Sequence, residues 1–469
     1  MSRRAWTLIG VLAALVVLVG AYFVLSRPKP APAPAAALPE LSKGDKDKLV
    51  KVVLSDRPEG TLTLVKTAEK WNTEPPVSVV LEPTSIDNLL YSFSALSAER
   101  IIEEKPADLG QYGLAPPRAV ATGTWADGTS RTLLLGDKAP SGASYYIQVK
   151  GDPKVYTVQS YTGQDFHWTL KDLRSRTLTP AINYEEVEYV KIVERDGTVL
   201  EVKRKTEAET RSFQLGFGQF LMTRPYTTQR GLDSQKQDSV IKGAQAVSIS
   251  DFAPDPAKGL DAYGLARPRE EVIVRDKSNT IDYLFGDQKG TQTWFAVRGQ
   301  PGVYLTDTSS LDFLKAKPFD LIDKFTFIPN IEDVDRMDIT TAGKTHSLGI
   351  TRTTKKAAKA GDPDEVTAAY SADGKKVEDD SFKKFYQSLI GLQVEGEMAR
   401  KVPNAPEVSV EFFLNKGDVK TVRVDYAPYD RDFKAIFLNG VGEFALTKGQ
   451  LSAMLGKLDL LLTGQKVTD

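Results

Sequence analysis

One short phrase occurs twice in this chain. Residues 109–117 read LGQYGLAPP, and residues 260–268, about 150 residues further on, read LDAYGLARP. Repetition at domain-scale spacing is typical of a structural unit that has been copied along a chain. The phrase therefore constrains the fold more than the composition does, because whatever unit surrounds its first occurrence is expected to recur around the second.

The similarity extends well beyond the phrase. Gly136-Asp137 ends the segment RTLLLGD, and Gly286-Asp287 ends the corresponding segment IDYLFGD. Three pairs of segments follow the phrase in the same order in both copies: 131–137 with 281–287, 144–158 with 293–307, and 172–180 with 320–329. Because chance does not hold such a register, we interpret the two stretches as an internal repeat.

A third and more degenerate copy occupies the C-terminal part of the chain. Four of its segments follow the same order: 408–417, 419–426, 433–447 and 458–462. The YGL phrase is missing there, and KVPNAP at 401–406 stands in its place. We therefore predict five parts: a membrane anchor (1–27), a Pro/Ala-rich linker (28–46), repeat module 1 (47–183), repeat module 2 (184–330) and a degenerate repeat module 3 (331–469).

Each module is expected to belong to the α+β class. Polar and apolar residues mostly alternate in the runs that open the units, as in half-buried antiparallel strands. Apolar residues at helical spacing predict one amphipathic helix per unit: 86–96 after a Ser85 cap, 233–242, and 382–390 after an Asp380 or Ser381 cap. A second short helix is expected to close each unit, for example at 163–173 and 448–455. The predicted fold is an N-terminal transmembrane helix followed by three tandem repeated modules, each a mainly antiparallel sheet with one or two helices.

We interpret the repeated phrase as a corner between the helical half and the sheet half of each unit. Its glycines are expected to take a positive φ, which glycine adopts without steric cost. The tyrosines and leucines beside them are expected to pack into the core, and the prolines to start the next strand at a sheet edge. This structural role, preferred to ligand binding, is assigned to Tyr112, Gly113, Leu114, Pro117, Gly136, Tyr263, Gly264, Leu265, Pro268 and Gly286.

The N-terminus predicts the location of the protein. Arg3 and Arg4 precede the uncharged apolar run Ala5–Leu25, and about 20 such residues make a helix that crosses a bilayer. A signal peptide cleaved at AAAL, 35–38, is the alternative, although the apolar segment of a signal peptide is usually shorter. We favour a single-pass anchor in the inner (cytoplasmic) membrane, with the bulk of the chain extracytoplasmic or periplasmic. The proline-rich stretch 28–40 favours extended polyproline II structure and would act as a spacer.

Composition excludes several classes of site. The chain has no cysteine, which removes disulfides, thiol nucleophiles and iron–sulfur ligation. Its two histidines, His167 and His346, are too few for a metal centre with three histidine ligands. Lys+Arg at 61 and Asp+Glu at 62 give a net charge of −1, which lacks the basic excess of a nucleic-acid-binding protein. We expect no cofactor, no metal and no nucleic-acid partner.

The two histidines are weak candidates for catalysis. His167 lies between Asp165 and Trp168 and could act as a general base, but no nucleophile motif such as G-x-S-x-G accompanies it. His346 lies in the strand-like stretch GKTHSLGI and also lacks a partner in the sequence. We therefore expect no catalytic residue.

Metal and phosphate motifs are equally weak. The acidic clusters at 362–365 and 378–381 lack the ligand spacing of a calcium loop, and the second fits the start of a helix. GFGQF at 216–220 lacks the strand–turn–helix context of a phosphate-binding loop. These segments are expected to be structural or solvent-exposed.

The order of these features resembles a known family. Trp71, a helix, L..YGL..P, a dipeptide turn, L..GD, a tyrosine- and valine-rich hairpin and a closing Asp-Leu are similar to the domain-of-unknown-function family 4340. The resemblance covers most of 47–329 and, more weakly, 330–469. It implies a membrane-anchored extracytoplasmic protein, often encoded beside gliding-motility-type ABC transporter components, and it carries over no catalytic residues.

Together, these features predict a non-enzymatic, membrane-anchored accessory or scaffold protein that has protein partners and is associated with an ABC-type transport or envelope complex. One alternative is a periplasmic binding module for polysaccharide or another envelope ligand, which a cleft between modules lined by aromatics would favour. The other is a hydrolase, which needs a cleft that joins His167 or His346 to a carboxylate within hydrogen-bond reach.

Overall fold

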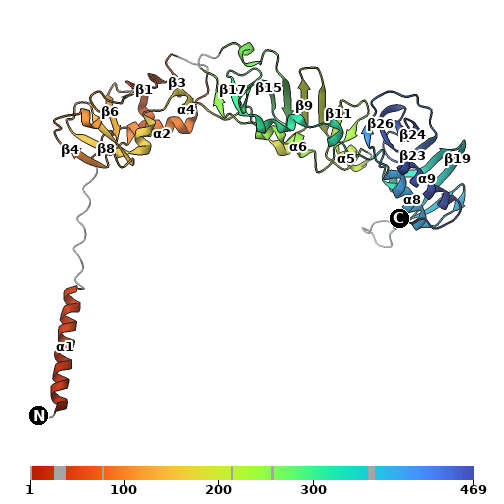
Figure 1. Cartoon of the computed structure of the whole chain (residues 1–469), viewed down its shortest axis with the longest axis horizontal. Coiled ribbons are helices and arrows are strands. Elements are labelled where there is room, and N and C mark those ends of the chain that lie inside the picture. The colour runs from red at the N-terminus through yellow and green to blue at the C-terminus, as the bar shows by residue number, and fades with distance from the viewer. Residues whose placement is uncertain are drawn as a thin grey trace. The chain divides into compact units, whose positions relative to one another are not determined.

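The structure, a computed structural model, describes residues 3–25, 39–75, 79–212, 215–254, 258–356 and 365–468 (Figure 1). The chain divides into two compact units. The first comprises Met1–Val77 and Leu81–Arg174, and the second comprises Ser78–Val80 and Ser175–Asp469. Most of the predicted spacer, at 26–38, lies outside the described residues.

The chain begins with helix α1 (Arg3–Leu25). Among the residues that the structure describes, no helix is both long enough and apolar enough to qualify as a membrane span. The N-terminal anchor therefore remains a prediction.

The first unit contains one sheet of eight strands. They lie in the order β3-β2-β1-β5-β6-β7-β8-β4, and each recorded pairing is antiparallel. The strand after the YGL phrase, β5, therefore lies beside the first strand of the unit. The strands are β1 (Leu49–Ser55), β2 (Leu62–Thr67), β3 (Lys70–Thr73), β4 (Arg100–Glu103), β5 (Ala119–Trp125), β6 (Ser130–Lys138), β7 (Ser144–Val149) and β8 (Val155–Gln159).

The second unit contains two sheets of nine strands each. The second sheet has the order β12-β11-β10-β9-β14-β15-β16-β17-β13, and its pairings are antiparallel. Its strands are β9 (Tyr189–Glu194), β10 (Val199–Arg204), β11 (Phe220–Arg224), β12 (Arg230–Gly231), β13 (Asp251–Phe252), β14 (Glu270–Arg275), β15 (Thr280–Lys289), β16 (Gln292–Val297) and β17 (Tyr304–Asp307).

The third sheet repeats this plan as β21-β20-β19-β18-β23-β24-β25-β26-β22, again antiparallel. Once the strands are renumbered from the start of each sheet, the second and third sheets have one strand order, and the first differs from it by one outer strand. Three mainly antiparallel sheets with a common topology are consistent with tandem modules. The strands are β18 (Val334–Thr341), β19 (Lys344–Lys355), β20 (Glu365–Ala372), β21 (Lys375–Lys376), β22 (Gly396–Glu397), β23 (Val408–Leu414), β24 (Thr421–Pro428), β25 (Phe433–Leu438) and β26 (Val441–Thr447).

Helices cover one face of each sheet, but their ends differ from the prediction. In the first sheet, α2 (Pro83–Ser94) begins two residues before Ser85, because Pro83 at the first helical turn has its φ preset for a helix. In the third, α8 (Asp379–Ile390) begins after Glu378, so the predicted caps Asp380 and Ser381 lie inside the helix. The corresponding helix of the second sheet is reduced to α6 (Asp238–Ile241) and a 3₁₀ turn, η4 (Gly243–Ala246).

The closing helices also differ in length. The predicted helix 163–173 is two short helices, α3 (Ser160–Asp165) and α4 (Leu170–Leu173), whereas α9 (Lys448–Leu462) extends beyond the predicted 448–455. The remaining helical segments are η1 (Lys46–Lys48), η2 (Gly110–Tyr112), η3 (Tyr184–Glu186), α5 (Glu207–Ser212), η5 (Leu260–Tyr263), η6 (Thr308–Lys315), α7 (Pro318–Leu321) and η7 (Ile331–Asp333).

Each sheet has its main core on one face. In the second sheet, Phe285 and Phe295 belong to this core, which continues into the third sheet. Their neighbours Leu284 and Trp294 belong to a smaller cluster with Tyr263. Because side chains alternate between the faces of a strand, this smaller cluster lies on the opposite face. The YGL phrase therefore packs against the face that the main core does not use.

Candidate functional site

The two YGL phrases have the same backbone geometry. In each, a 3₁₀ turn, η2 or η5, ends at a glycine in the left-handed region: φ is 65° at Gly113 and 71° at Gly264. This is the positive φ that the sequence predicted, and a residue with a Cβ is strained there. The leucine that follows each glycine, Leu114 or Leu265, is buried.

The Gly-Asp dipeptide of the next hairpin contacts each phrase. A Cβ at Gly136 would lie under 3.0 Å from the carbonyl oxygen of Tyr112, closer than real Cβ atoms approach. A Cβ at Gly113 would approach the Asp137 carboxylate equally closely. The second sheet repeats both approaches: Gly286 against the carbonyl oxygen of Tyr263, and Gly264 against Asp287. We call this five-residue arrangement, Tyr-Gly-Leu with Gly-Asp, the clasp.

The tyrosine ring of each clasp lies at a steep angle against an aromatic ring at the same position of β7 or β16. The Tyr112 ring lies 5.0 Å from that of Tyr146, and the Tyr263 ring lies 4.7 Å from that of Trp294. Tyr263 is buried, whereas Tyr112 is half-buried and its hydroxyl donates to Oε2 of Glu103 at 2.7 Å. This hydrogen bond to a carboxylate raises the pKa of Tyr112 to about 12.

Each clasp also marks an irregularity in its sheet. The pairing of β6 with β7 shifts register between Leu135 and Lys138, and that of β15 with β16 shifts between Phe285 and Gln288. The Gly-Asp dipeptide therefore sits in a β-bulge, which leaves residues outside the ladder and bends the strand. The clasp holds this bend against the 3₁₀ turn.

The third sheet lacks both halves of the clasp. Leu135, Phe285 and Tyr426 occupy equivalent positions, because each pairs with the first residue of the strand before it. Ala427-Pro428 therefore replaces Gly-Asp, and β24 pairs with β25 there without a register shift. Ala427 and Phe437 form a small apolar cluster against which Val402 of KVPNAP packs.

The prolines of the phrase do not start an edge strand, contrary to the prediction. Pro117 and Pro268 each precede their strand by two residues, and β5 and β14 lie in the middle of their sheets. A central position is compatible with these prolines because they lie ahead of the ladder, where no backbone donor is required of them. Pro117 makes an isolated bridge to Leu114 instead.

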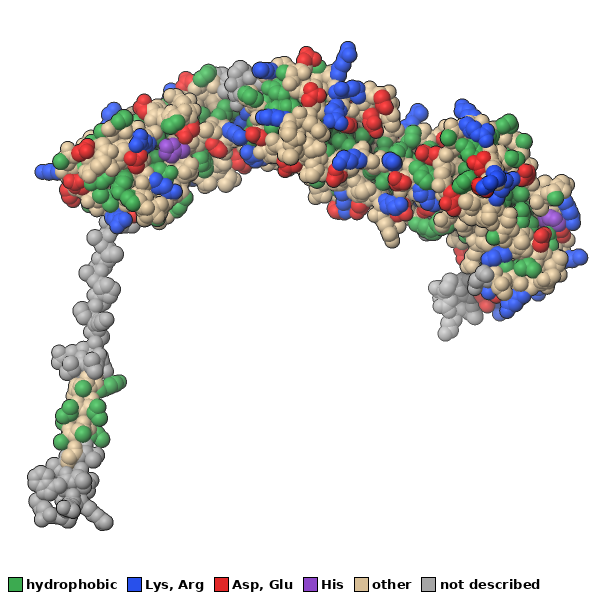
Figure 2. Space-filling view, in the orientation of Figure 1, with side chains coloured by type: hydrophobic (Ala, Val, Ile, Leu, Met, Phe, Trp, Pro, Cys, Tyr) green, Lys and Arg blue, Asp and Glu red, His purple; other side chains and the backbone are tan. Residues whose placement is uncertain are grey.

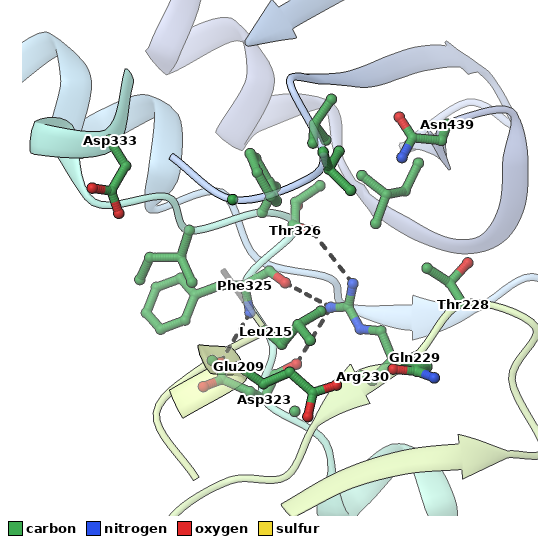
Figure 3. A pocket seen from close by; sticks show the side chains of 18 of the residues that line it. Glu209, Leu215, Thr228, Gln229, Arg230, Asp323, Phe325, Thr326, Asp333 and Asn439 are labelled. Carbon is green, nitrogen blue, oxygen red and sulfur yellow. Dashed lines mark hydrogen bonds between the residues drawn. The ribbon is translucent and has the colours of Figure 1, made fainter. Parts of the chain in front are cut away.

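A cavity of about 940 Å³ lies between the second and third sheets, within the second unit (Figure 3). Arg230 of β12 projects into it and is 7% exposed. Its lining combines carboxylates, amides and hydroxyls with phenylalanine and aliphatic side chains. The residues are Ala208, Glu209, Leu215, Gly216, Thr228, Gln229, Arg230, Gly231, Asp323, Phe325, Thr326, Phe327, Ile328, Asp333, Lys416, Gly417, Asp418, Val419, Val422, Leu438 and Asn439.

Arg230 fastens the segment that connects the two sheets. Its Nη2 donates to the carbonyl oxygen of Phe325 at 2.6 Å and to that of Asp323 at 3.4 Å, and Nη1 donates to that of Thr326 at 3.3 Å (Figure 3). The guanidinium also lies 5.1 Å from the centre of the Phe444 ring, in the third sheet. Burial lowers the pKa of Arg230, but carbonyl oxygens on the connecting segment satisfy its charge.

Further bonds join the loop before β12 to the third sheet. The Tyr226 hydroxyl donates to Oε1 of Glu397 at 2.7 Å. The backbone N–H groups of Thr227 and Thr228 donate to the two oxygens of Glu443 at 2.5 and 3.1 Å. These contacts make the wall of the cavity part of a hydrogen-bonded junction. The sequence analysis missed the junction, because its residues have no counterpart in the repeat and are up to 216 positions apart.

Comparison with known proteins identifies the family. The chain matches the family model described as domain of unknown function (DUF4340) over residues 71–266 and again over residues 221–407. It belongs to this family. No curated protein and no solved structure matches the chain. The DUF4340 matches span the clasps of the first two sheets, the Arg230 side of the junction and part of the third sheet, and they end before Glu443 and Phe444.

In this DUF4340 protein, His346 has a partner that the sequence analysis did not find. Its Nδ1 lies 2.8 Å from Oδ2 of Asp373, and Oδ1 of the same carboxylate accepts from the backbone N–H of Ser347 at 3.0 Å. Asp373 has a φ of 46° in the turn after β20. The hydrogen bond from His346 lowers the pKa of Asp373. The pair fixes a hairpin turn, and neither residue lines the cavity.

His167 has a looser neighbour. Its Nδ1 lies 3.6 Å from Oε1 of Glu59, and its ring lies 6.0 Å from that of Tyr145. Asp165, next to it in the sequence, accepts instead from the Ser92 hydroxyl at 2.7 Å. The two histidines of the DUF4340 chain are thus in separate units, and the structure brings neither to the clasp or the cavity.

The remaining candidate motifs have structural roles where they are described. Among the described residues, no group of three or more His, Asp or Glu could hold a metal ion. The cluster at 362–365 lies outside the described residues except for Glu365, and the cluster at 378–381 forms the start of α8. In GFGQF, Gly216 has a φ of 85° against Asp323, and Gly218 lies against the carbonyl oxygen of Leu232. These glycines allow close packing of backbone at the cavity wall.

Proposed function

We propose that this protein is a non-enzymatic, membrane-anchored extracytoplasmic accessory or scaffold protein of an ABC-type transport or envelope complex. The observation that carries the proposal is the role of the residues that the two clasps share. The residues of the repeated clasp serve backbone geometry, packing or local polar contacts such as the Asp137–Arg118 ion pair. These shared residues determine the shape of the modules and do not form a shared set of reactive side chains. Such a repeat suits a protein that presents surfaces to partners.

The membrane anchor rests on the apolar run Ala5–Leu25 and on the spacer after it. Its test is fractionation of the full chain expressed in a Gram-negative host, beside a variant that lacks residues 1–27. The full chain should stay with the membrane after alkaline carbonate extraction and should be digested by protease added to spheroplasts. Release into the soluble fraction, or protection from protease, would contradict the anchor or its orientation.

The association with a transporter rests on the family resemblance. It is tested by photo-crosslinking in native membranes, with the crosslinking amino acid placed at exposed positions of each sheet, such as Tyr91, Phe217 and Val366. The expected product is a crosslink to an ABC-transporter subunit from at least one of these positions. Crosslinks only to lipid, or only to soluble periplasmic proteins, would count against the proposal.

A ligand-binding module is the second candidate, and the cavity between the second and third sheets favours it. Phe325 and Phe327 supply aromatic surface, and Glu209, Gln229 and Asn439 supply the planar polar groups that hydroxyl-rich ligands use. Isothermal titration with fragments of envelope polysaccharide tests this candidate. Binding should be lost when Phe325 is replaced with alanine and should persist in a Tyr91→Ala control, which changes an exposed aromatic of the first unit.

A hydrolase is the least supported reading. His346 has a carboxylate within hydrogen-bond reach, but the pair holds a hairpin turn and does not line the cavity. A chain carrying His167→Ala and His346→Ala together should retain full complementation of a deletion strain. Loss of complementation by a variant that still folds would favour catalysis over scaffolding.

A further inference from the structure

The outer edge of the third sheet is open along most of one strand. On its inner side, β20 pairs with β19 along the whole of Glu365–Ala372. On its outer side, β21 pairs only with Ser371 and Ala372. Within the described part of the chain, no strand pairs with Glu365–Tyr370 on that side. The corresponding strand of the first sheet, β3, spans only Lys70–Thr73, and no described strand lies outside it.

The backbone groups of the open edge can be assigned. The carbonyl oxygen of Tyr370 accepts from Val377 N–H on the outer side, whereas Asp373 N–H donates to Ser347 on the inner side. Hydrogen bonding alternates along an antiparallel strand. The N–H and C=O groups of Val366 and Ala368 therefore point outward, as a template for another strand.

One face of this edge is apolar. Val366 is 58% exposed, and Ala368 packs against the edge of the main core. Tyr370, two residues further on, is buried and stacks on Phe382 of α8 at 4.4 Å. A strand added beside β20 would therefore continue the core with every second side chain.

Lysines lie at both ends of the same edge. Lys355 lies opposite Glu365, and Lys375 and Lys376 form β21. Among the described residues, no ion pair of these three lysines is recorded. Figure 2 shows both basic and acidic side chains on the surface of the third sheet. At one end Glu365 of β20 lies beside Lys355 of β19, so the lysines of β21 supply the clearer positive charge at the other end.

We propose that the β20 edge binds an extended acidic segment of a partner protein, which adds to the third sheet as a further strand. Alternate apolar side chains of the segment would meet Val366 and Ala368, and its carboxylates would face the lysines. A second copy of this chain is the poorer occupant, because pairing two lysine-flanked edges opposes like charges. The inference goes beyond the proposed function in naming the surface and the partner's chemistry, and it does not require the partner to be a transporter subunit.

The test measures binding of a fluorescein-labelled peptide of alternating glutamate and valine to the full chain by fluorescence anisotropy. Saturable binding is expected, and Ala368→Pro should weaken it at least tenfold because proline removes an outward N–H but no bond to β19. The matched control, Ala368→Ser, keeps that N–H and should bind more tightly than Ala368→Pro. Lys376→Glu should weaken binding, and a lysine–valine peptide should not compete.

A second probe covers the case in which Ala368→Pro does not fold. The same peptide, N-methylated at alternate amides, keeps its side chains but cannot pair as a strand, and it should not bind. Equal binding of the methylated and unmethylated peptides, or equal affinity of folded Ala368→Pro and Ala368→Ser chains, would overturn the proposal. So would peptide-independent dimers that Ala368→Pro abolishes in analytical ultracentrifugation, since these would make the edge a self-association surface.

Discussion

The connection that the YGL phrase forms in the first two sheets is built differently in the third sheet. In the first two, a left-handed glycine, a bulge and a Gly-Asp dipeptide form the clasp. In the third, the hairpin is regular, Ala427 fills the glycine position, and Val402 packs where the phrase would lie. The phrase and the dipeptide are thus present together or absent together. Their joint absence from the third sheet indicates that the phrase and the dipeptide act together. The dipeptide alone would leave a bulge with nothing packed against it, and the phrase alone would clash with a regular strand.

The largest expected effect comes from adding a methyl group to the inner glycine. Gly286→Ala should destabilise the second sheet by about 3 kcal/mol, because the new Cβ would overlap a backbone carbonyl that cannot move aside freely. Gly136→Ala should do the same in the first sheet. Hydrogen exchange of β14 and β15, or of β5 and β6, followed by mass spectrometry measures the local loss.

The control for this prediction is the reverse change in the third sheet. Ala427→Gly removes a buried methyl group and should cost only about 1 kcal/mol, measured on β23 and β24. An equal cost in all three sheets would mean that the clasp glycines are ordinary strand positions.

An intermediate effect is expected at the left-handed glycine. Gly264→Ala should cost about 1 to 2 kcal/mol because alanine is strained at positive φ and its Cβ crowds the Asp287 carboxylate. Adding Asp287→Ala should recover part of that loss by removing the crowding. Hydrogen exchange of the β15 amides measures the effect of each substitution. If the two effects are fully additive, Asp287 does not act as part of the clasp.

A smaller, pH-dependent effect is expected to distinguish the first clasp from the second. The folded-state pKa of Tyr112 is raised to about 12, so its protonated hydroxyl contributes stability that is present below pH 10 and is lost as pH rises from 10 to 12. Tyr112→Phe should remove that part of the alkaline destabilisation of the first sheet. Tyr263→Phe is the matched substitution in the second clasp, where the hydroxyl accepts from the Lys258 N–H at 3.2 Å. Thermal unfolding across this pH range measures both.

The repeat made much of the fold predictable. Alternation identified the strands, and the shared segments indicated three similar units, whose sheets have a common strand order. Predictions from local sequence patterns failed where tertiary packing determines the structure. Pro117 looked like an edge residue because proline cannot join a ladder, but it lies just ahead of a central strand. Helix starts moved because Pro83 and Asp379 extend the first turns.

The candidate sites depended on contacts that no local pattern contains. The partner of His346 lies 27 residues away in a left-handed turn, so the strand-like stretch GKTHSLGI could not reveal it. The junction around Arg230 joins four separate segments: the loop before β12, residues 323–326, Glu397 and residues 443–444. Only the clasp could be found by comparing the chain with itself, and even there the role of Gly136 as a close approach needed the structure.

The most direct test of the account is a pair of double-substitution cycles, with local unfolding free energies read from hydrogen exchange. Gly264→Ala with Gly286→Ala changes both halves of one clasp, whereas Gly113→Ala with Gly286→Ala changes halves of two clasps in different units. The account predicts that the first pair falls short of additivity by about 1 kcal/mol or more, since the second change meets a clasp already broken, and that the second pair is additive. Additivity within the single clasp would contradict the claim that the repeated phrase and its dipeptide act as one device.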